Sequence, residues 1–297
     1  MKRIFTVLSV LLLMLASFTA GMEYPRGDVD QSGDVNIGDV VVLIDYLLTG
    51  TWPDEPDDPA VTFNVNGVSF TMMAIEGGTF NMGATSEQGT DAYDWEKPVH
   101  EVTLSNYFIG QTEVTQELWI AVMGSNPSYY NTAPELPVER VTWNDCQTFI
   151  SKLNEMTGKS FRLPTEAEWE FAARGGNLSR GYKYAGGDDI NAMGWYWGNI
   201  PSHYGGTTGY GTQPVATKLP NELGLFDMTG NVWEWCQDWY GNYSSAAQED
   251  PTGPSWGSYR IFRGGSWSRS AESCRVSYRN FNYPSSSDDS MGLRLAL

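Results

Sequence analysis

Residues 224–239 read G-L-F-D-M-T-G-N-V-W-E-W-C-Q-D-W, a composition that fits neither a regular helix nor a regular strand. Apolar residues follow neither the two-residue period of a strand nor the spacing of an amphipathic helix. Gly230 followed by Asn231 is typical of a turn that tolerates a positive φ angle. Asp227 and Glu234 flank this turn. The stretch therefore predicts irregular backbone that folds back between two carboxylates.

Two interpretations of these acids remain open. Folded back on themselves, Asp227 and Glu234 could meet around a hard cation such as calcium, with main-chain carbonyls between them as further oxygen ligands. Alternatively, Asp227 caps the turn and Glu234 forms a salt bridge. The spacing alone does not choose between a metal site and a purely structural role.

The same stretch resembles the signature of the formylglycine-generating enzyme family, also called sulfatase-modifying factors. Two further segments agree, namely R-L-P-T-E-A-E-W-E-F-A-A-R-G-G at 162–176 and R-G-G-S-W at 263–267. A closing G-L-R follows at 292–294, so the motifs occur in the family's order. The resemblance covers about residues 70–297. It implies an α+β, loop-rich fold of the formylglycine-generating enzyme type, related to C-type lectin folds.

In this family the central motif binds structural calcium. Carried over to this chain, the resemblance implies calcium ligation by the side chains of Asp227 and Glu234 and by the main-chain carbonyls of Gly230 and Val232. Calcium would then fix the irregular backbone of this stretch.

Active members of the family oxidise a cysteine of a sulfatase to formylglycine with molecular oxygen, using copper(I) held by two cysteines five residues apart. Copper(I) prefers soft thiolate ligands. Here the second position is Cys274, but the first is Arg269, whose guanidinium stays cationic and cannot replace a thiolate. The family positions that line the active-site pocket fall on Ser266 and Trp233. We therefore expect a domain that has lost copper and the oxidase reaction.

The chain has three cysteines. Cys146 falls on the apolar face of a predicted helix, where it would act as a small core residue. Because the family fold brings the calcium motif and the R-G-G-S-W segment together, the resemblance implies a disulfide between Cys236 and Cys274. The alternative is two separate buried thiols.

Residues 1–21 have the pattern of a secretory signal, with Lys2 and Arg3, an apolar run at 4–18 and small residues at 19–21. The apolar run is short for a membrane span. The formal net charge is −18. So acidic a chain is a poor partner for nucleic acid or anionic membranes, and divalent cations suit it better. We expect a secreted or cell-surface protein with no membrane span.

The stretch D-V-D-Q-S-G-D-V-N-I-G-D at 28–39 has the spacing of an EF-hand calcium loop, with glycine at its sixth position. It resembles one dockerin repeat, which suggests a unit at 22–50 with a cohesin-like partner. The expected calcium ligands are Asp28, Asp30, Ser32, Asp34, Asn36 and Asp39. An acidic, proline-rich linker is predicted at 51–60, ahead of the main domain at 61–297.

Local patterns predict several elements of the main domain. An Asn66-Gly67 turn between alternating segments indicates a hairpin. Residues 107–115 read as a strand that leads into a helix at 116–123. Thr142 and Thr165 are positioned to cap two further helices, the second with Glu168 in a capping box. Residues 177–223 lack periodicity and predict long loops.

Two classes of function follow. One is an exported, calcium-binding module that uses the family's groove for a protein or glycan ligand. The other is a formylglycine-generating oxidase with altered metal ligands, for which only His100 and His203 supply imidazoles. The loss of the first copper cysteine favours the binding module.

Overall fold

The computed structural model describes residues 60–90, 92–201 and 209–297. Contacts divide the chain after Asp58, and the described elements belong to the second unit, Pro59–Leu297. The predicted signal sequence (1–21), the EF-hand-like unit (22–50) and nearly all of the linker (51–60) lie outside the described residues.

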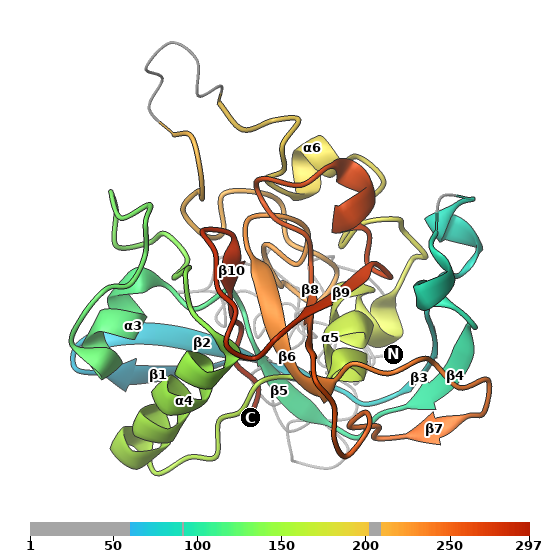
Figure 1. Ribbon diagram of the computed structural model, residues 1–297, viewed down its shortest axis with the longest axis horizontal. Helices are drawn as coiled ribbons and strands as arrows, with labels where there is room; N and C mark the ends of the chain where they lie inside the picture. The colour runs from blue at the N-terminus through green and yellow to red at the C-terminus, as the bar shows by residue number, and fades with distance from the viewer. Residues whose placement is uncertain (1–59, 91, 202–208) are drawn as a thin grey trace, which may run out of the picture. The chain divides into compact units, whose positions relative to one another are not determined.

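The described part contains three small sheets, with strand orders β1-β2-β5, β10-β6-β8-β9 and β3-β4-β7. The strands are β1 (Ala60–Val65), β2 (Val68–Ile75), β3 (Thr79–Met82), β4 (His100–Thr103), β5 (Tyr107–Gly110), β6 (Trp233–Trp239), β7 (Gln248–Glu249), β8 (Arg260–Arg263), β9 (Arg279–Asn282) and β10 (Met291–Gly292). Figure 1 shows β6 and β8 side by side in the middle of the unit, between α4 (Trp143–Thr157) and α5 (Glu166–Ala173).

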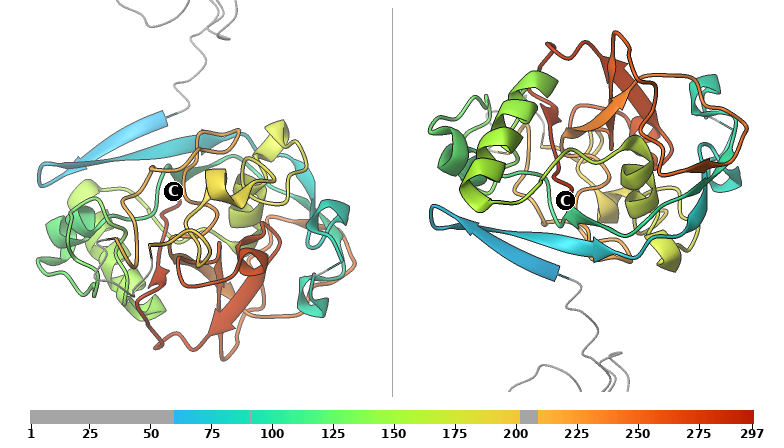
Figure 2. Two further views of the ribbon diagram at one scale, coloured as in Figure 1. Left: turned by 90° about the horizontal axis from the view of Figure 1, so that it is seen from above. Right: turned by 90° about the horizontal axis from the view of Figure 1, so that it is seen from below.

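The predicted hairpin is confirmed. Strands β1 and β2 pair antiparallel up to Val65 and Val68, and the turn residues Asn66 and Gly67 have φ angles of 51° and 89°. These left-handed conformations are those that an Asn-Gly hairpin turn requires. The hairpin runs along one side of the unit in both views of Figure 2.

The predicted helices are also confirmed. Helix α3 (Gln116–Met123) begins after Thr115, and α4 begins after Thr142, whose hydroxyl accepts a hydrogen bond from the Asp145 N–H. Helix α5 has the predicted capping box between Thr165 and Glu168. A short helix, α6 (Ile190–Met193), lies within the segment 177–223. The remaining single-turn 3-10 helices are η1 (Ser86–Gln88), η2 (Asp94–Glu96), η3 (Gly176–Leu178) and η4 (Ala271–Cys274).

Aromatic side chains form much of the core. Trp233 and Trp235 are buried against Phe262, and Trp169 of α5 is fully buried. Cys146 is buried on the inner face of α4, as its position in the sequence predicted. Among the described residues, none of the helices has the length and apolarity needed to cross a membrane.

Buried ion pairs supplement this core. Glu166, Glu168 and Glu170 are all buried on α5, and each is paired with an arginine. Arg279 binds both carboxylate oxygens of Glu166, and Arg263 binds Glu170. The local sequence does not determine whether these acids are solvated or paired, and the structure shows that they are paired.

Candidate functional site

Strand β6 places Glu234 in the centre of the unit, with both carboxylate oxygens engaged. Arg294 donates to Oε1 at 2.7 Å and to Oε2 at 2.9 Å, and the Trp169 indole N–H donates to Oε2 at 2.6 Å. All three side chains are fully buried. Arg294 belongs to the closing G-L-R motif, so that motif supplies the counter-charge of the central one. Glu234 thus forms a salt bridge, as in the structural interpretation of the sequence.

Asp227 lies at a strained position ahead of the turn, with a φ angle of 58°. Its Oδ2 accepts a hydrogen bond from the Ala216 N–H at 2.7 Å, whereas Oδ1 is buried without a partner. Burial raises the pKa of Asp227 to about 6. A buried carboxylate oxygen without a donor is costly and calls for a partner such as a cation.

Glu113 joins this acidic site, and sequence reasoning missed it. Its Oε1 accepts from the Val232 N–H at 2.9 Å, and its Oε2 accepts from the Asn231 side chain at 2.7 Å. Burial, followed by the nearby Asp227 and Glu234 carboxylates, raises the pKa of Glu113 well above its ordinary value. Glu113 lies more than a hundred residues upstream, just beyond β5, so no local pattern could connect it to the turn.

The residues around this turn fit calcium in part. Asp227 offers an unpartnered oxygen, while Glu234 already serves Arg294 and Trp169. The N–H groups of Gly230 and Val232 are used in hydrogen bonds to the Gly264 carbonyl and to Glu113, which leaves their carbonyls as candidate ligands. In the described parts of the chain, no three Asp, Glu, His or Cys side chains are arranged to hold a metal ion. A cation here would depend mainly on Asp227 and on carbonyl oxygens.

The R-G-G-S-W segment follows β8 and makes a tight double-glycine turn. Gly264 and Gly265 have φ angles of 96° and 80°. A Cβ on Gly265 would lie 2.4 Å from the Cys274 sulfur, so only glycine fits at this position. The turn therefore packs directly on Cys274 at the end of η4.

Cys274 is fully buried, and its sulfur contacts the Ser270 carbonyl at 3.6 Å. Burial raises the pKa of this thiol to about 12. A thiol that holds its proton at neutral pH is a poor nucleophile. Arg269, at the first copper position, is exposed and has its backbone N–H bonded to the Ser266 carbonyl. The residues present do not fit a copper(I) ion.

The expected disulfide between Cys236 and Cys274 is wrong, because both cysteines are buried free thiols. Cys236 lies on β6 among the side chains that surround Trp169, whereas Cys274 packs with Tyr184, Ile190 and Met193. The two segments are close in the fold, but the two sulfurs lie in different hydrophobic clusters. The alternative of two separate buried thiols holds.

Ser266 and Trp233 are both buried, so the family's pocket positions are enclosed here. The Ser266 hydroxyl lies 3.2 Å from that of Ser268, and Trp233 packs against Phe262 and Tyr278. Trp233 thus has the core role that clustered tryptophans commonly have.

Four aromatic residues are linked to Arg269, either directly or through one another, and three of them are exposed. Tyr93 and Trp95 stack at 4.3 Å, and the Tyr93 ring meets Tyr278 edge-on at 5.8 Å. The Trp197 backbone N–H donates to the Arg269 carbonyl, and the Trp197 side chain is 61% exposed. We call Tyr93, Trp95, Trp197, Arg269 and Tyr278 the aromatic face.

The small sheets, the β6 acid held by the closing arginine and the double-glycine turn over Cys274 define a domain of the formylglycine-generating enzyme type, and the predicted α+β, loop-rich fold is confirmed. The chain belongs to the family of the sulfatase-modifying factor enzyme 1-like domain, which matches residues 65–297.

Curated relatives include enzymes and proteins with other names. The formylglycine-generating enzyme of Thermomonospora curvata is 34% identical, over 76% of this chain and 92% of the enzyme. The chaperone protein LppX of Paenibacillus barcinonensis is 33% identical, over 71% of this chain and 83% of LppX. Among solved structures, Treponema denticola variable protein 1 is 34% identical with a TM-score of 0.70, covering 80% of this chain and 98% of that protein.

Proposed function

We propose that this chain is an exported, calcium-binding member of the family that acts as a binding module and does not carry out the copper-dependent oxidation. One observation carries the proposal: Arg269 occupies the first copper position on the surface, while Cys274 is a buried free thiol beneath Gly265. A single thiol, with arginine at the other family position, cannot supply the two-thiolate site that copper(I) needs.

The alternative of an oxidase with altered metal ligands has little support. His100 is the one histidine within the described residues. Its Nδ1 lies 3.0 Å from the Pro98 carbonyl, and its ring packs on Tyr243. These contacts place His100 near the far end of β6 from Trp233, whereas His203 lies outside the described residues. His100 therefore offers no replacement for the missing cysteine.

The aromatic face is the surface that we assign to ligand binding. Exposed tyrosine, tryptophan and arginine are the residue types that dominate binding energy at protein interfaces. Relatives named as a chaperone and as a formylglycine-generating enzyme support a protein ligand, and a glycan ligand is the second option. A cohesin-like partner of residues 22–50 remains part of the proposal, as does export directed by residues 1–21.

Copper chemistry is tested with the purified mature protein, a cysteine-bearing peptide and an oxygen electrode. The natural chain should bind no copper(I) tightly and consume no oxygen above background. Arg269→Cys should gain tight copper(I) binding, while Arg269→Ser, the matched control without sulfur, should not. Peptide-dependent oxygen consumption by the natural chain that disappears in Cys274→Ser would overturn the proposal.

Calcium binding by the main domain is tested by thermal unfolding with calcium or with a chelator. Calcium at 100 times its dissociation constant stabilises the folded state by about 2.7 kcal/mol. The rise in the melting temperature of the main domain should therefore reach several degrees and be lost in Asp227→Asn. The control Asp94→Asn alters an exposed acid and should keep the full shift. An unchanged calcium response in Asp227→Asn would exclude Asp227 as a ligand.

A further inference from the structure

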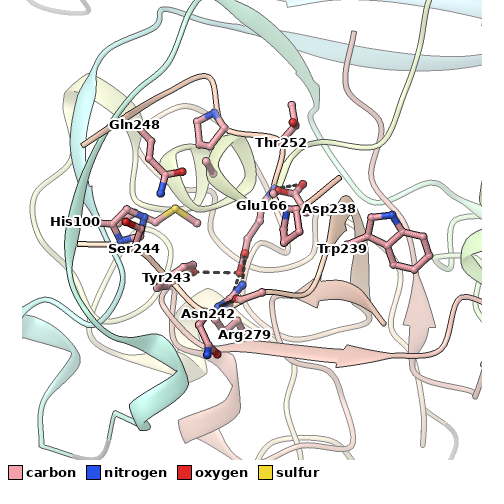
Figure 3. Close-up of a pocket in the computed structure, with 16 residues that line it drawn as sticks. His100, Glu166, Asp238, Trp239, Asn242, Tyr243, Ser244, Gln248, Thr252 and Arg279 are labelled. Atoms are coloured by element: carbon pink, nitrogen blue, oxygen red, sulfur yellow. Dashed lines mark hydrogen bonds and ion pairs between the residues drawn. The ribbon is translucent and has the colours of Figure 1, made fainter. Parts of the chain in front are cut away.

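A cavity of about 300 Å³ opens at the end of β6 that is remote from Trp233. Its lining includes His100 of β4, Asp238 of β6, the 242–244 loop, Gln248 of β7 and Thr252. In Figure 3, Gln248, His100 and Ser244 lie on one side of the cavity, and Asp238 and Thr252 lie on the other. The full lining comes from five separate parts of the chain, namely Met82, His100, 166–167, 238–254 and Arg279.

This cavity is distinct from the family site. Trp233 and Asp238 lie near opposite ends of β6, and a strand rises about 3.3 Å per residue, so the two sites are separated by roughly 15–20 Å. What this cavity binds does not depend on the proposed function.

The ions in the cavity wall are balanced among themselves. Arg279 donates to both oxygens of Glu166, at 2.7 and 2.6 Å, and the Tyr243 hydroxyl donates to the same carboxylate at 3.1 Å. Arg263 lies 3.4 Å from Glu166 and also pairs with Glu170, which in turn pairs with Arg174. Arg174 also binds Glu87, so three arginines meet three glutamates. No unbalanced ion in this wall is left to attract a charged ligand.

Asp238 adds little charge near neutral pH. Its Oδ2 accepts a hydrogen bond from the Glu166 N–H at 2.9 Å. Burial, together with the neighbouring Glu166 carboxylate, raises the pKa of Asp238 to about 8. The group is then a neutral carboxyl that can both donate and accept.

The side chains that remain available are neutral and bifunctional. Within the described residues, no hydrogen bond engages the side chains of Asn242, Gln248 or Thr252, and all three line the cavity. Amides and hydroxyls each offer donors as well as acceptors, as the hydroxyl groups of a sugar do. Met82, Ala167 and Pro254 add apolar wall for the C–H face of a sugar ring.

We propose that this cavity binds one ring of a neutral saccharide. Its volume lies at the small end of the range for ligand pockets, about 300–1,000 Å³, which suits a single ring rather than a long oligosaccharide. The amide and hydroxyl side chains recognise the sugar hydroxyls, and the internally paired ions make the site selective against charged analogues. A free sugar and the terminal residue of a glycan share this chemistry.

The test uses the full mature protein and saturation-transfer NMR with glucose, galactose, mannose and N-acetylglucosamine. Glucosamine and glucuronate serve as the cationic and anionic analogues, and a methyl glycoside compared with a longer glycan distinguishes a free sugar from a chain end. At least one neutral sugar should bind with a millimolar or lower dissociation constant, at least 10-fold more tightly than the charged analogues. Absence of binding by every neutral sugar up to 50 mM, or preference for a charged analogue, would overturn the proposal.

Variants locate the binding. Asn242→Ala and Gln248→Ala each remove one group that hydrogen-bonds the sugar and should weaken binding by about 3- to 10-fold. Asn144→Ala removes an exposed amide of α4 that does not line the cavity, so it is the matched control and should leave sugar affinity unchanged. Near-UV circular dichroism checks that each variant keeps its packing. Sugar binding that survives in the Asn242→Ala, Gln248→Ala double variant would place the sugar elsewhere and refute the assignment.

Discussion

The buried ion pairs are complete in this chain, whereas the segment Ser266–Cys274 lacks one of the two cysteines expected for copper binding. Every buried acid of α5 has an arginine partner, and Arg275 likewise binds both oxygens of Glu96 at 2.7 and 2.6 Å. The double-glycine turn before the Ser266–Cys274 segment is intact, but one of the two copper-binding positions of the family holds arginine. The scaffold is complete while the reactive pair is not.

This difference shows that separate residues specify the fold and the reaction. A buried charge without its partner destabilises the whole domain, so the ion pairs must be complete for the chain to fold. Arg269 is exposed and contributes no such constraint. A change there can remove a reaction and leave the fold as it was, which is why family membership alone does not establish the activity.

Breaking a buried ion pair should cause the largest loss of folding stability. Arg275→Met leaves Glu96 buried without a counter-charge and should lower the free energy of unfolding by about 3–5 kcal/mol, measured by urea denaturation. Burial opposes ionisation of Glu96, but hydrogen bonds from Arg275 and Ser277 outweigh it and keep its pKa below the ordinary value.

A double variant and a surface control sharpen this result. Glu96→Met combined with Arg275→Met removes both charges and should recover part of the loss. Asp94→Ala breaks the exposed pair with Lys97 and should leave the denaturation midpoint unchanged. A loss below 1 kcal/mol in Arg275→Met alone would contradict the structural role of the pair.

A substitution in the double-glycine turn should cause the second-largest loss of folding stability. Gly265→Ala forces a side chain into a φ of 80° and against the Cys274 sulfur, and should cost about 1–3 kcal/mol. Gly158→Ala is the matched control, since its φ is 66° but no atom lies within 4 Å of the added Cβ. Equal losses in the two variants would show that packing on Cys274 adds nothing to the backbone strain.

Asp238 should make stability depend on pH. Its folded-state pKa of about 8 exceeds its unfolded value near 4, so the folded state keeps a proton that the unfolded state releases. Stability should therefore fall as pH rises from about 4 to 8, by at most about 1.4 kcal/mol per pH unit from this group. Asp238→Asn should flatten this part of the urea-denaturation profile, and parallel profiles for the two proteins would refute the assignment.

Arg269→Ala should have the smallest effect on folding. Its side chain is exposed, and surface substitutions of this kind usually change the free energy of unfolding by less than about 0.5 kcal/mol. Urea denaturation of this variant beside Arg275→Met compares the two regions directly. A loss above 1 kcal/mol would mean that Arg269 is retained for stability.

Local elements of the fold were predictable because neighbouring residues determine them. The Asn66-Gly67 turn and the Thr165–Glu168 capping box each act over at most three residues. The site was predictable only in part. Asp227 and Glu234 stand in one motif, whereas Glu113 and Arg294 reach the same buried space from 114 residues before and 67 residues after Asp227.

The sequence by itself determined the family, the cap and turn residues, and the arginine that replaces the first copper cysteine. Only the tertiary structure decided which charges pair, that Cys236 and Cys274 stay apart, and that a neutral polar cavity forms at the end of β6. The physical reason is range. Caps and turns are satisfied within a few residues of chain, but a buried carboxylate or thiol takes its partner from whichever distant segment the packing brings alongside it.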